Sequence, residues 1–143
     1  MLLLGCIADD LTGATDLGIT LAREGLSVIQ VNGIPESGLA VPVADAVVVA
    51  LKSRTIPPAD AIAQALAALA WLHACGAERI YFKYCSTFDS TPRGNIGPVT
   101  EALREALGVA PDGLPTPATP AYPRNGRTVY RGHLFVGDVL LSD

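Results

Sequence analysis

Functional side chains are concentrated in the stretch from Lys83 to Asn95. This stretch follows a short run of β-branched and aromatic residues and precedes apolar residues at helical spacing, so it is predicted as a loop between a strand and a helix. The ammonium, hydroxyl, carboxylate, guanidinium and amide groups of the loop belong to Lys83, Ser86, Thr87, Asp89, Ser90, Thr91, Arg93 and Asn95. Gly94 would let the backbone approach a ligand closely. Such loops hold the ligand in open α/β sheets, so the stretch predicts a binding site for a small polar molecule.

Two adjacent carboxylates, Asp9 and Asp10, follow another apolar run that covers residues 2–7. Neighbouring side chains on a regular strand point to opposite faces, so we expect only one of the two to enter a site as a ligand or catalytic group. The other would have a structural role, such as capping the helix that is predicted from about Thr12. Either aspartate fits either role.

Basic residues also follow the predicted strands. Lys52 and Arg54 come directly after the apolar run 46–50, and Lys83 ends the run 79–83. A guanidinium can bind a carboxylate through two parallel hydrogen bonds, which lysine cannot do. The net charge of −4 argues against a nucleic-acid partner. A local group of cations in an acidic chain indicates a small anionic ligand.

A predicted α/β fold positions these residues. Apolar runs predict strands at residues 2–7, 27–31, 46–50 and 79–83, and helical spacing predicts helices at about 12–24, 58–74 and 96–108. The alternation predicts an open, mostly parallel sheet with helices on both faces, Rossmann-like but without a dinucleotide fingerprint. Because the carboxyl ends of parallel strands meet at one edge, one of the aspartates, Arg54, Lys83 and the loop that follows should converge in one crevice.

The chain changes character after residue 110. Five prolines between residues 111 and 123 exclude a helix and predict an extended, irregular segment. Asn125 and Gly126 then form a predicted turn, and residues 127–130 and 133–136 are predicted as short strands, either a hairpin or an addition to the sheet. An apolar run reaches the last residues without a closing element, so we expect a truncated domain.

Composition narrows the classes of function. The length of 143 residues suits one domain, and no apolar run approaches the roughly 18 residues of a membrane helix. With no signal sequence recognised, we expect a cytoplasmic protein without a membrane partner. Three cysteines without C-x-x-C spacing indicate reduced thiols, and two histidines argue against a metal site. Neither the dinucleotide fingerprint nor a P-loop occurs, so no nucleotide cradle is expected in this chain.

Three motifs together resemble a known family. They read Ala8-Asp-Asp-Leu-Thr-Gly-Ala-x-Asp16, Lys83-Tyr-Cys-Ser-Thr-Phe-Asp-Ser-Thr-x-x-Gly-Asn-Ile-Gly-Pro-Val99 and Asn125-Gly-Arg-Thr-Val-Tyr-x-Gly-His-Leu-Phe-Val136. They are similar to the amino-terminal, sugar-acid-binding domain of the four-carbon acid sugar kinases. The residues from Cys85 to Asp89 are most like the 3-oxo-tetronate kinase branch. The similarity covers essentially the whole chain, residues 1–143.

The resemblance implies an activity and a set of site residues. The activity is ATP-dependent phosphorylation of the terminal hydroxyl of a 3-oxo-tetronate, giving a 4-phosphate. ATP and Mg²⁺ would be held by a carboxyl-terminal domain absent here, so this chain alone is expected to bind neither and to be inactive. Residues implied to bind the substrate are Asp9, Asp10, Lys83, Ser86, Thr87, Asp89, Ser90, Gly94 and Asn95. Arg54 is added, although Lys52 stands where the wider family carries an aspartate.

Roles within the implied crevice follow from side-chain chemistry. Arg54 and Lys83 would hold the carboxylate, while hydroxyl groups and Asn95 would read the sugar oxygens. One carboxylate would accept the proton of the reacting hydroxyl, and we predict Asp10 in this catalytic role, with Asp9 and Asp89 as alternatives. Two other functions stay open: a stand-alone module that binds a small hydroxy acid, and a metal-dependent phosphatase at the Asp9–Asp10 turn. A homo-oligomer is a further alternative.

Overall fold

Strands and helices alternate through the first three quarters of the chain. The computed structural model describes residues 2–36, 43–86, 91, 93–110, 112–113 and 115–142. The elements of the first part are β1 (Leu4–Ala8), α1 (Leu11–Arg23), β2 (Val28–Asn32), β3 (Ala46–Ala50), α2 (Pro58–Ala74), β4 (Arg79–Lys83) and α3 (Ile96–Ala106). The second part holds the 3-10 helix η1 (Pro123–Asn125) and strands β5 (Arg127–Tyr130), β6 (His133–Val136) and β7 (Val139–Leu140).

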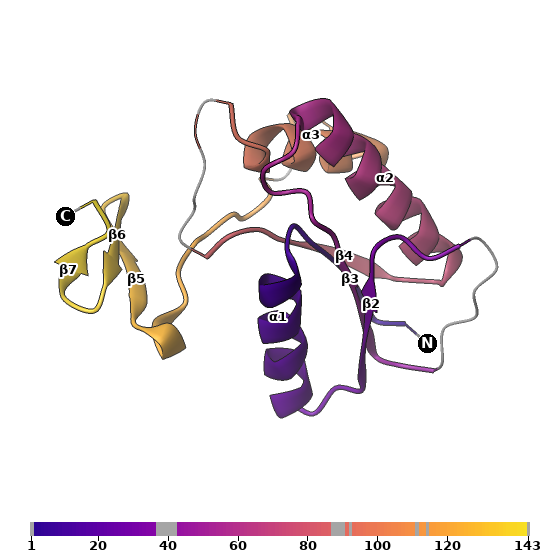
Figure 1. Cartoon of the computed structure of the whole chain (residues 1–143), viewed down its shortest axis with the longest axis horizontal. Helices are drawn as coiled ribbons and strands as arrows, with labels where there is room; N and C mark the ends of the chain where they lie inside the picture. The colour runs from indigo at the N-terminus through magenta and orange to yellow at the C-terminus, as the bar shows by residue number, and fades with distance from the viewer. Residues whose placement is uncertain are drawn as a thin grey trace.

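The four strands of the first part form one parallel sheet in the order β2-β3-β1-β4. Helix α1 covers one face of the sheet, and α2 and α3 lie together on the other (Figure 1). The predicted open α/β sheet with helices on both faces is therefore confirmed. Ala8 of β1 pairs with Ala50 of β3 and with Lys83 of β4, so these three strands end side by side.

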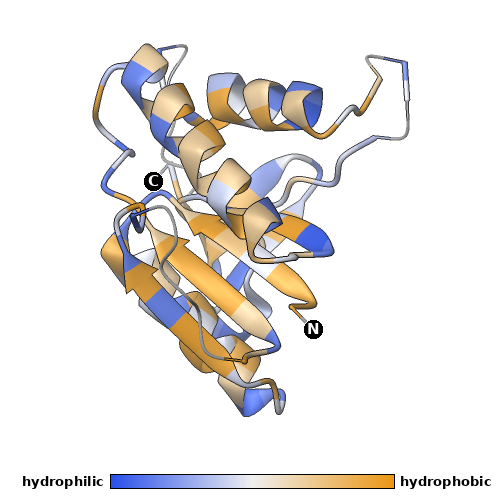
Figure 2. Ribbon diagram, turned by 90° about the vertical axis from the view of Figure 1, so that its right-hand side faces the viewer, coloured by the Kyte–Doolittle hydropathy of each residue, from blue (hydrophilic) through white to orange (hydrophobic). Residues whose placement is uncertain are grey.

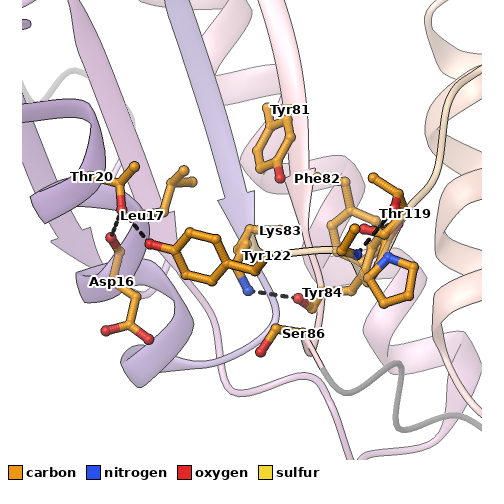
Figure 3. Close-up of a pocket in the computed structure, with 12 residues that line it drawn as sticks. Asp16, Leu17, Thr20, Tyr81, Phe82, Lys83, Tyr84, Ser86, Thr119 and Tyr122 are labelled. Atoms are coloured by element: carbon orange, nitrogen blue, oxygen red, sulfur yellow. Dashed lines mark hydrogen bonds between the residues drawn. The ribbon is translucent and has the colours of Figure 1, made fainter. Parts of the chain in front are cut away.

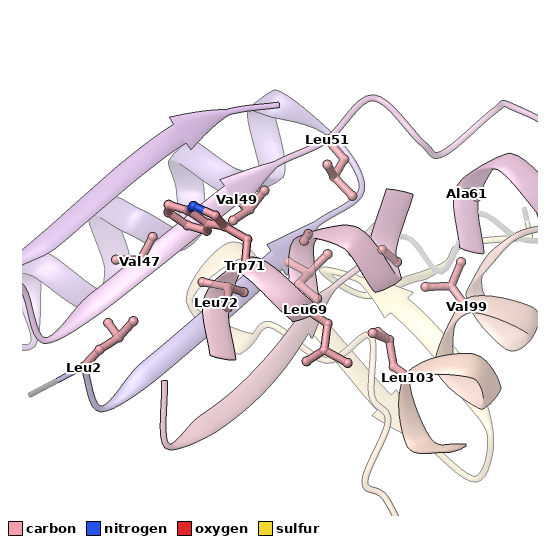
Figure 4. Packing of buried hydrophobic residues seen from close by; sticks show 13 residues of the cluster. Leu2, Val47, Val49, Leu51, Ala61, Leu69, Trp71, Leu72, Val99 and Leu103 are labelled. Carbon is pink, nitrogen blue, oxygen red and sulfur yellow. The ribbon is translucent and has the colours of Figure 1, made fainter. Parts of the chain in front are cut away.

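The sheet is buried on both faces because apolar residues occupy both alternating positions of its central strands. Val47 and Val49 pack toward α2 and α3 together with Ile7, whereas Cys6 and Val48 pack toward α1. Figure 2 shows how hydrophobic residues dominate the strands, and Figure 4 shows the larger cluster, in which Trp71 and its neighbours from α2 meet the sheet. This packing fixes the strand ends that carry the polar loops.

The last part of the chain folds as a hairpin with a third strand. Strands β5, β6 and β7 form a separate antiparallel sheet, which confirms the hairpin alternative of the sequence analysis. The sheet lies apart from the four-stranded one (Figure 1). The sheet and the residue that follows it expose several large apolar side chains: Val129, Tyr130, Val136, Val139 and Leu141. Among the helices of the described residues, none combines the length and apolarity needed to cross a membrane.

Candidate functional site

Arg54 joins the two aspartates at the carboxyl edge of the sheet. Its Nε and Nη2 atoms donate to Asp9 Oδ2 and Oδ1 at 3.2 and 3.0 Å, and Nη2 also lies 2.8 Å from Asp10 Oδ2. The Asp9 side chain is only 7% exposed. The hydrogen bond to Asp9 is the main reason that the pKa of Arg54 lies above its ordinary value. The guanidinium is therefore a fixed cation between two carboxylates.

Both aspartates contact the same guanidinium, although their side chains were expected to point apart. The expectation that only one of them enters the site as a ligand or catalytic group stays a prediction. Strand β1 ends at Ala8, so Asp9 and Asp10 lie beyond it and the alternation of a regular strand no longer governs them. The expected capping role falls to Asp10, whose Oδ1 accepts a 2.6 Å hydrogen bond from the Gly13 N–H. The proposed catalytic role of Asp10 stays a prediction.

Lys83 lies at the start of the polar loop, beside the first turn of α1. Its carbonyl accepts a hydrogen bond from the Asp9 N–H at 3.0 Å, and its Nζ donates to the Tyr84 carbonyl at 2.7 Å. A Cβ atom on Gly13 would lie 3.3 Å from Lys83 Nζ and 2.5 Å from Asp10 Oδ1. The ammonium can approach the helix start because Gly13 has no side chain.

Gly13→Ala should therefore destabilise the protein, even though alanine is the better helix former. The added methyl group would displace the Asp10 cap, and losing such a cap costs about 1 kcal/mol. Gly18→Ala in the same helix is the matched control, because a Cβ there meets only Val28 Cγ1 at 3.8 Å. Urea unfolding should show a lower free energy of unfolding for Gly13→Ala and a free energy of unfolding that is higher by about 0.5–1 kcal/mol for Gly18→Ala. Equal effects of the two changes would contradict this prediction.

Asn95 holds the loop between β3 and α2. Its buried Nδ2 atom lies 2.7, 3.2 and 2.9 Å from the carbonyl oxygens of Ser53, Arg54 and Ile56. An amide NH₂ has two protons, so the three acceptors share them. These contacts of Asn95 with three carbonyl oxygens were not predicted from the sequence, and the proposed contact of Asn95 with sugar oxygens stays a prediction.

The other predicted site residues are distributed around this edge. The Gly94 N–H donates to the Thr91 carbonyl at 2.8 Å, next to Asn95. Ser86 turns toward the second part of the chain, where its Oγ accepts a hydrogen bond from Arg127 Nη1. Lys52 and Arg93 are exposed. Thr87, Asp89 and Ser90 lie outside the described residues.

A pocket of about 170 Å³ adjoins Lys83 on the α1 side of the sheet (Figure 3). Its walls come from α1, from β4 with the residues that follow it, and from a short segment before η1. The lining residues are Asp16, Leu17, Thr20, Tyr81, Phe82, Lys83, Tyr84, Ser86, Thr119, Pro120, Ala121 and Tyr122. Lys83 and Ser86 were predicted site residues, whereas Thr20, Tyr84 and Tyr122 were not.

Part of this pocket had a signal in the sequence. Asp16 and Thr20 are four residues apart on α1 and flank Leu17 in the helical pattern, so a polar stripe beside the apolar one could have been noticed. Tyr122 follows a proline-rich segment without periodicity, and nothing in that segment indicates which element it packs against. Within the described ranges, no three His, Cys, Asp or Glu side chains are grouped so that they could hold a metal ion.

Comparison with known proteins identifies the family. The family model of the sugar-binding N-terminal domain matches residues 4–143. The chain belongs to this family. Among solved structures, this sugar-binding N-terminal domain is similar to a Haemophilus influenzae protein, with a TM-score of 0.85 and 50% identity. That match covers 97% of this chain and 32% of the other.

Curated relatives of this sugar-binding N-terminal domain are longer proteins. A 3-oxo-tetronate kinase of Burkholderia multivorans is 61% identical over 141 residues, which are 99% of this chain and 32% of that kinase. The chain thus spans about a third of the curated relatives it matches. A Bordetella bronchiseptica structure, a domain-swapped dimer with bound citrate, is similar with a TM-score of 0.74 and 33% identity. That match covers 97% of this chain and 34% of the Bordetella bronchiseptica chain.

Proposed function

We propose that this chain is the substrate-binding part of a kinase that uses ATP to phosphorylate a four-carbon acid sugar, converting 3-oxo-tetronate to its 4-phosphate. The names of the longer relatives support the reaction, and the family supports the sugar-binding role. Alone, these residues form an amino-terminal domain that holds the acid and does not turn it over.

The observation that carries the proposal is the position of Lys83. Its ammonium group lies next to Gly13 in the first turn of α1, and Lys83 also lines the pocket, so it faces the space where a small acid can enter. Arg54, by contrast, already binds both Asp9 and Asp10 through Nε and Nη2. Lys83 therefore takes the larger part in holding the substrate carboxylate, and Arg54 mainly positions the aspartates.

ATP does not fit the residues described here. In α/β folds a phosphate group commonly binds at the N-terminus of the helix after the first strand. In this chain the Asp10 carboxylate already accepts the Gly13 N–H at that position, and Asp9 lies next to it. Two carboxylates would repel a phosphate, so we assign ATP and its Mg²⁺ to the carboxyl-terminal part of the longer relatives and derive no step through them.

Lys83→Met tests the proposal, because methionine keeps the length of the side chain and removes the charge. A hydrogen bond to a charged group contributes about 1.5–3 kcal/mol, so binding of 3-oxo-tetronate should weaken about 10- to 100-fold. Lys52→Met is the matched control, since Lys52 is exposed and follows β3, another strand of the same sheet. Calorimetric titration of the two variants and the unaltered chain measures the difference.

The outcomes separate the proposal from its alternatives. Binding of the acid but not of ATP, weakened by Lys83→Met alone, would support a substrate-binding domain. Equal losses in both lysine variants, or no acid binding by the folded chain, would refute it. Magnesium-dependent release of phosphate without ATP would favour a phosphatase instead.

We also propose that the chain self-associates through the sheet of β5, β6 and β7. The sheet is small, lies apart from the main sheet and exposes apolar side chains such as Val139, which is 58% exposed. Three short strands gain stability mainly when a hydrophobic face is covered. The Bordetella bronchiseptica relative is a domain-swapped dimer. Sedimentation at several concentrations tests the proposal, and a purely monomeric chain would refute it.

A further inference from the structure

A hydrogen bond between residues far apart in sequence joins two walls of the pocket beside Lys83. Thr20 on α1 and Tyr122, just before η1, place their hydroxyl oxygens 3.0 Å apart. Figure 3 shows the Tyr122 ring reaching across from its segment toward α1. This contact brings a phenol oxygen to the wall of a pocket whose cation is Lys83.

Counting protons assigns the direction of this hydrogen bond. Thr20 Oγ1 lies 2.8 Å from the Asp16 carbonyl oxygen, which can only accept, so the single hydroxyl proton of Thr20 is used there. Thr20 Oγ1 must then accept from Tyr122, and the phenol is the donor. With its proton engaged, the Tyr122 oxygen offers lone pairs, so it can accept a hydrogen bond but cannot donate a second one.

A second phenol of the pocket also donates its proton to another group of the protein. The Tyr84 hydroxyl donates to the Thr119 carbonyl at 3.4 Å. Burial raises the pKa of the Tyr84 phenol, so the proton stays on the oxygen at neutral pH. Tyr122 therefore presents an acceptor to the pocket, whereas the Lys83 ammonium has three protons, of which the bond to the Tyr84 carbonyl uses one.

We infer that Tyr122, held by Thr20, determines specificity for a hydroxyl group of the bound acid. The inference rests on the proposed function, since it places the acid carboxylate at Lys83. A molecule with one carboxylate and several hydroxyl groups matches the polarity of this pocket: the carboxylate accepts from Lys83, and a hydroxyl donates to the Tyr122 oxygen. The volume of about 170 Å³ is below the roughly 300 Å³ at which pockets for drug-sized ligands begin, in keeping with a small acid.

Tyr122→Phe tests the inference, because it removes one oxygen and keeps the ring. Titration calorimetry on the 143-residue chain would compare erythronate and threonate with dihydroxybutyrates that lack one hydroxyl. A site that hydrogen-bonds a ligand hydroxyl discriminates against the analogue that lacks it. Tyr122→Phe should weaken binding of the trihydroxy acid about tenfold and leave at least one dihydroxy analogue unaffected. Tyr130→Phe, at an exposed tyrosine of β5, is the matched control and should change neither affinity.

Thr20→Val provides a second test through the proton of Tyr122. Valine cannot accept, so the phenol proton becomes available to the ligand and the Tyr122 oxygen can donate a hydrogen bond as well as accept one. The chain should then bind an acid with a keto group more tightly relative to one with a hydroxyl at the same carbon. Thermal unfolding followed by circular dichroism would show that both variants fold.

Failure of the inference differs from failure of the proposed function. Binding that depends on Lys83 but loses the same factor for every acid on Tyr122→Phe, or loses none, would overturn the role of Tyr122 alone. Absence of acid binding by the unaltered chain would overturn both.

Discussion

Replacing Arg54 with alanine should lower the free energy of unfolding by about 2–3 kcal/mol. The change would leave the Asp9 side chain, which is 7% exposed, without its two-pronged partner and would place it beside Asp10 without a cation. Breaking a fully buried ion pair from one side costs about 3–5 kcal/mol. The smaller value expected here reflects the 28% exposure of Arg54 and the 27% exposure of Asp10.

A surface ion pair of the same chain provides the control for this measurement. Arg124 Nη2 lies 2.8 Å from Glu24 Oε1, but the two side chains are 65% and 56% exposed. Arg124→Ala should therefore change stability by at most about 0.5 kcal/mol. Arg54→Lys keeps the charge but not the paired hydrogen bonds, so its loss should be intermediate. If urea unfolding gives Arg54→Ala and Arg124→Ala the same loss, the buried position of Asp9 is not what gives the pair its strength.

Asn95→Asp should destabilise the protein more than Asn95→Ala, although aspartate has nearly the same shape as asparagine. The Asn95 amide nitrogen faces three carbonyl oxygens, and a carboxylate has no proton to offer them. Alanine removes the donor and leaves buried carbonyls unsatisfied, at a cost of about 1–3 kcal/mol. A carboxylate adds repulsion between acceptors, so we expect at least about 3 kcal/mol at pH 7.

The pH dependence of this variant has a defined sign. Only the protonated form of the introduced carboxyl can donate to the carbonyls, so folding raises its pKa above the unfolded value. The penalty is therefore present in full above the folded pKa and shrinks as the pH falls toward the unfolded value, near 4. Unfolding of Asn95→Asp and Asn95→Ala at pH 7 and pH 5 measures it. If the difference between the two variants does not narrow at the lower pH, the carbonyl contacts are not its cause.

The sheet was predictable from sequence because its signals are local and strong. Four apolar runs predict the strands, and the run around residues 47–49 is one of them. The helical patterns that alternate with these runs end at glycines such as Gly25, whose φ of 95° suits the end of a helix. Parallel pairing then brings Arg54 and Lys83 to one edge with the aspartates, as the structure shows. The order of the strands and helices along the chain was sufficient to predict that these side chains lie at one edge of the sheet.

The contacts inside the site were less predictable, since they depend on where a strand ends and on what a side chain meets far away in sequence. Whether the Asp9 and Asp10 side chains point the same way or apart depends on whether β1 ends before them, as it does at Ala8. The partners of Asn95 are about forty positions away, and Tyr122 meets Thr20 across 102 positions. Polar side chains form hydrogen bonds with the donors and acceptors that the fold brings near them, and the local sequence pattern does not show which groups these are.

Tyr122 also connects the pocket to the sheet of β5, β6 and β7. Its backbone exchanges two hydrogen bonds with Arg127, the first residue of β5, at 2.9 and 3.1 Å, while its side chain reaches Thr20 on α1. An acid that binds Tyr122 would restrict the motion of the segment that leads into that sheet. Occupancy of the pocket would therefore lower the conformational entropy of the sheet. Linkage is reciprocal, and whatever immobilises the sheet, a second copy or another domain, would tighten acid binding by the same factor.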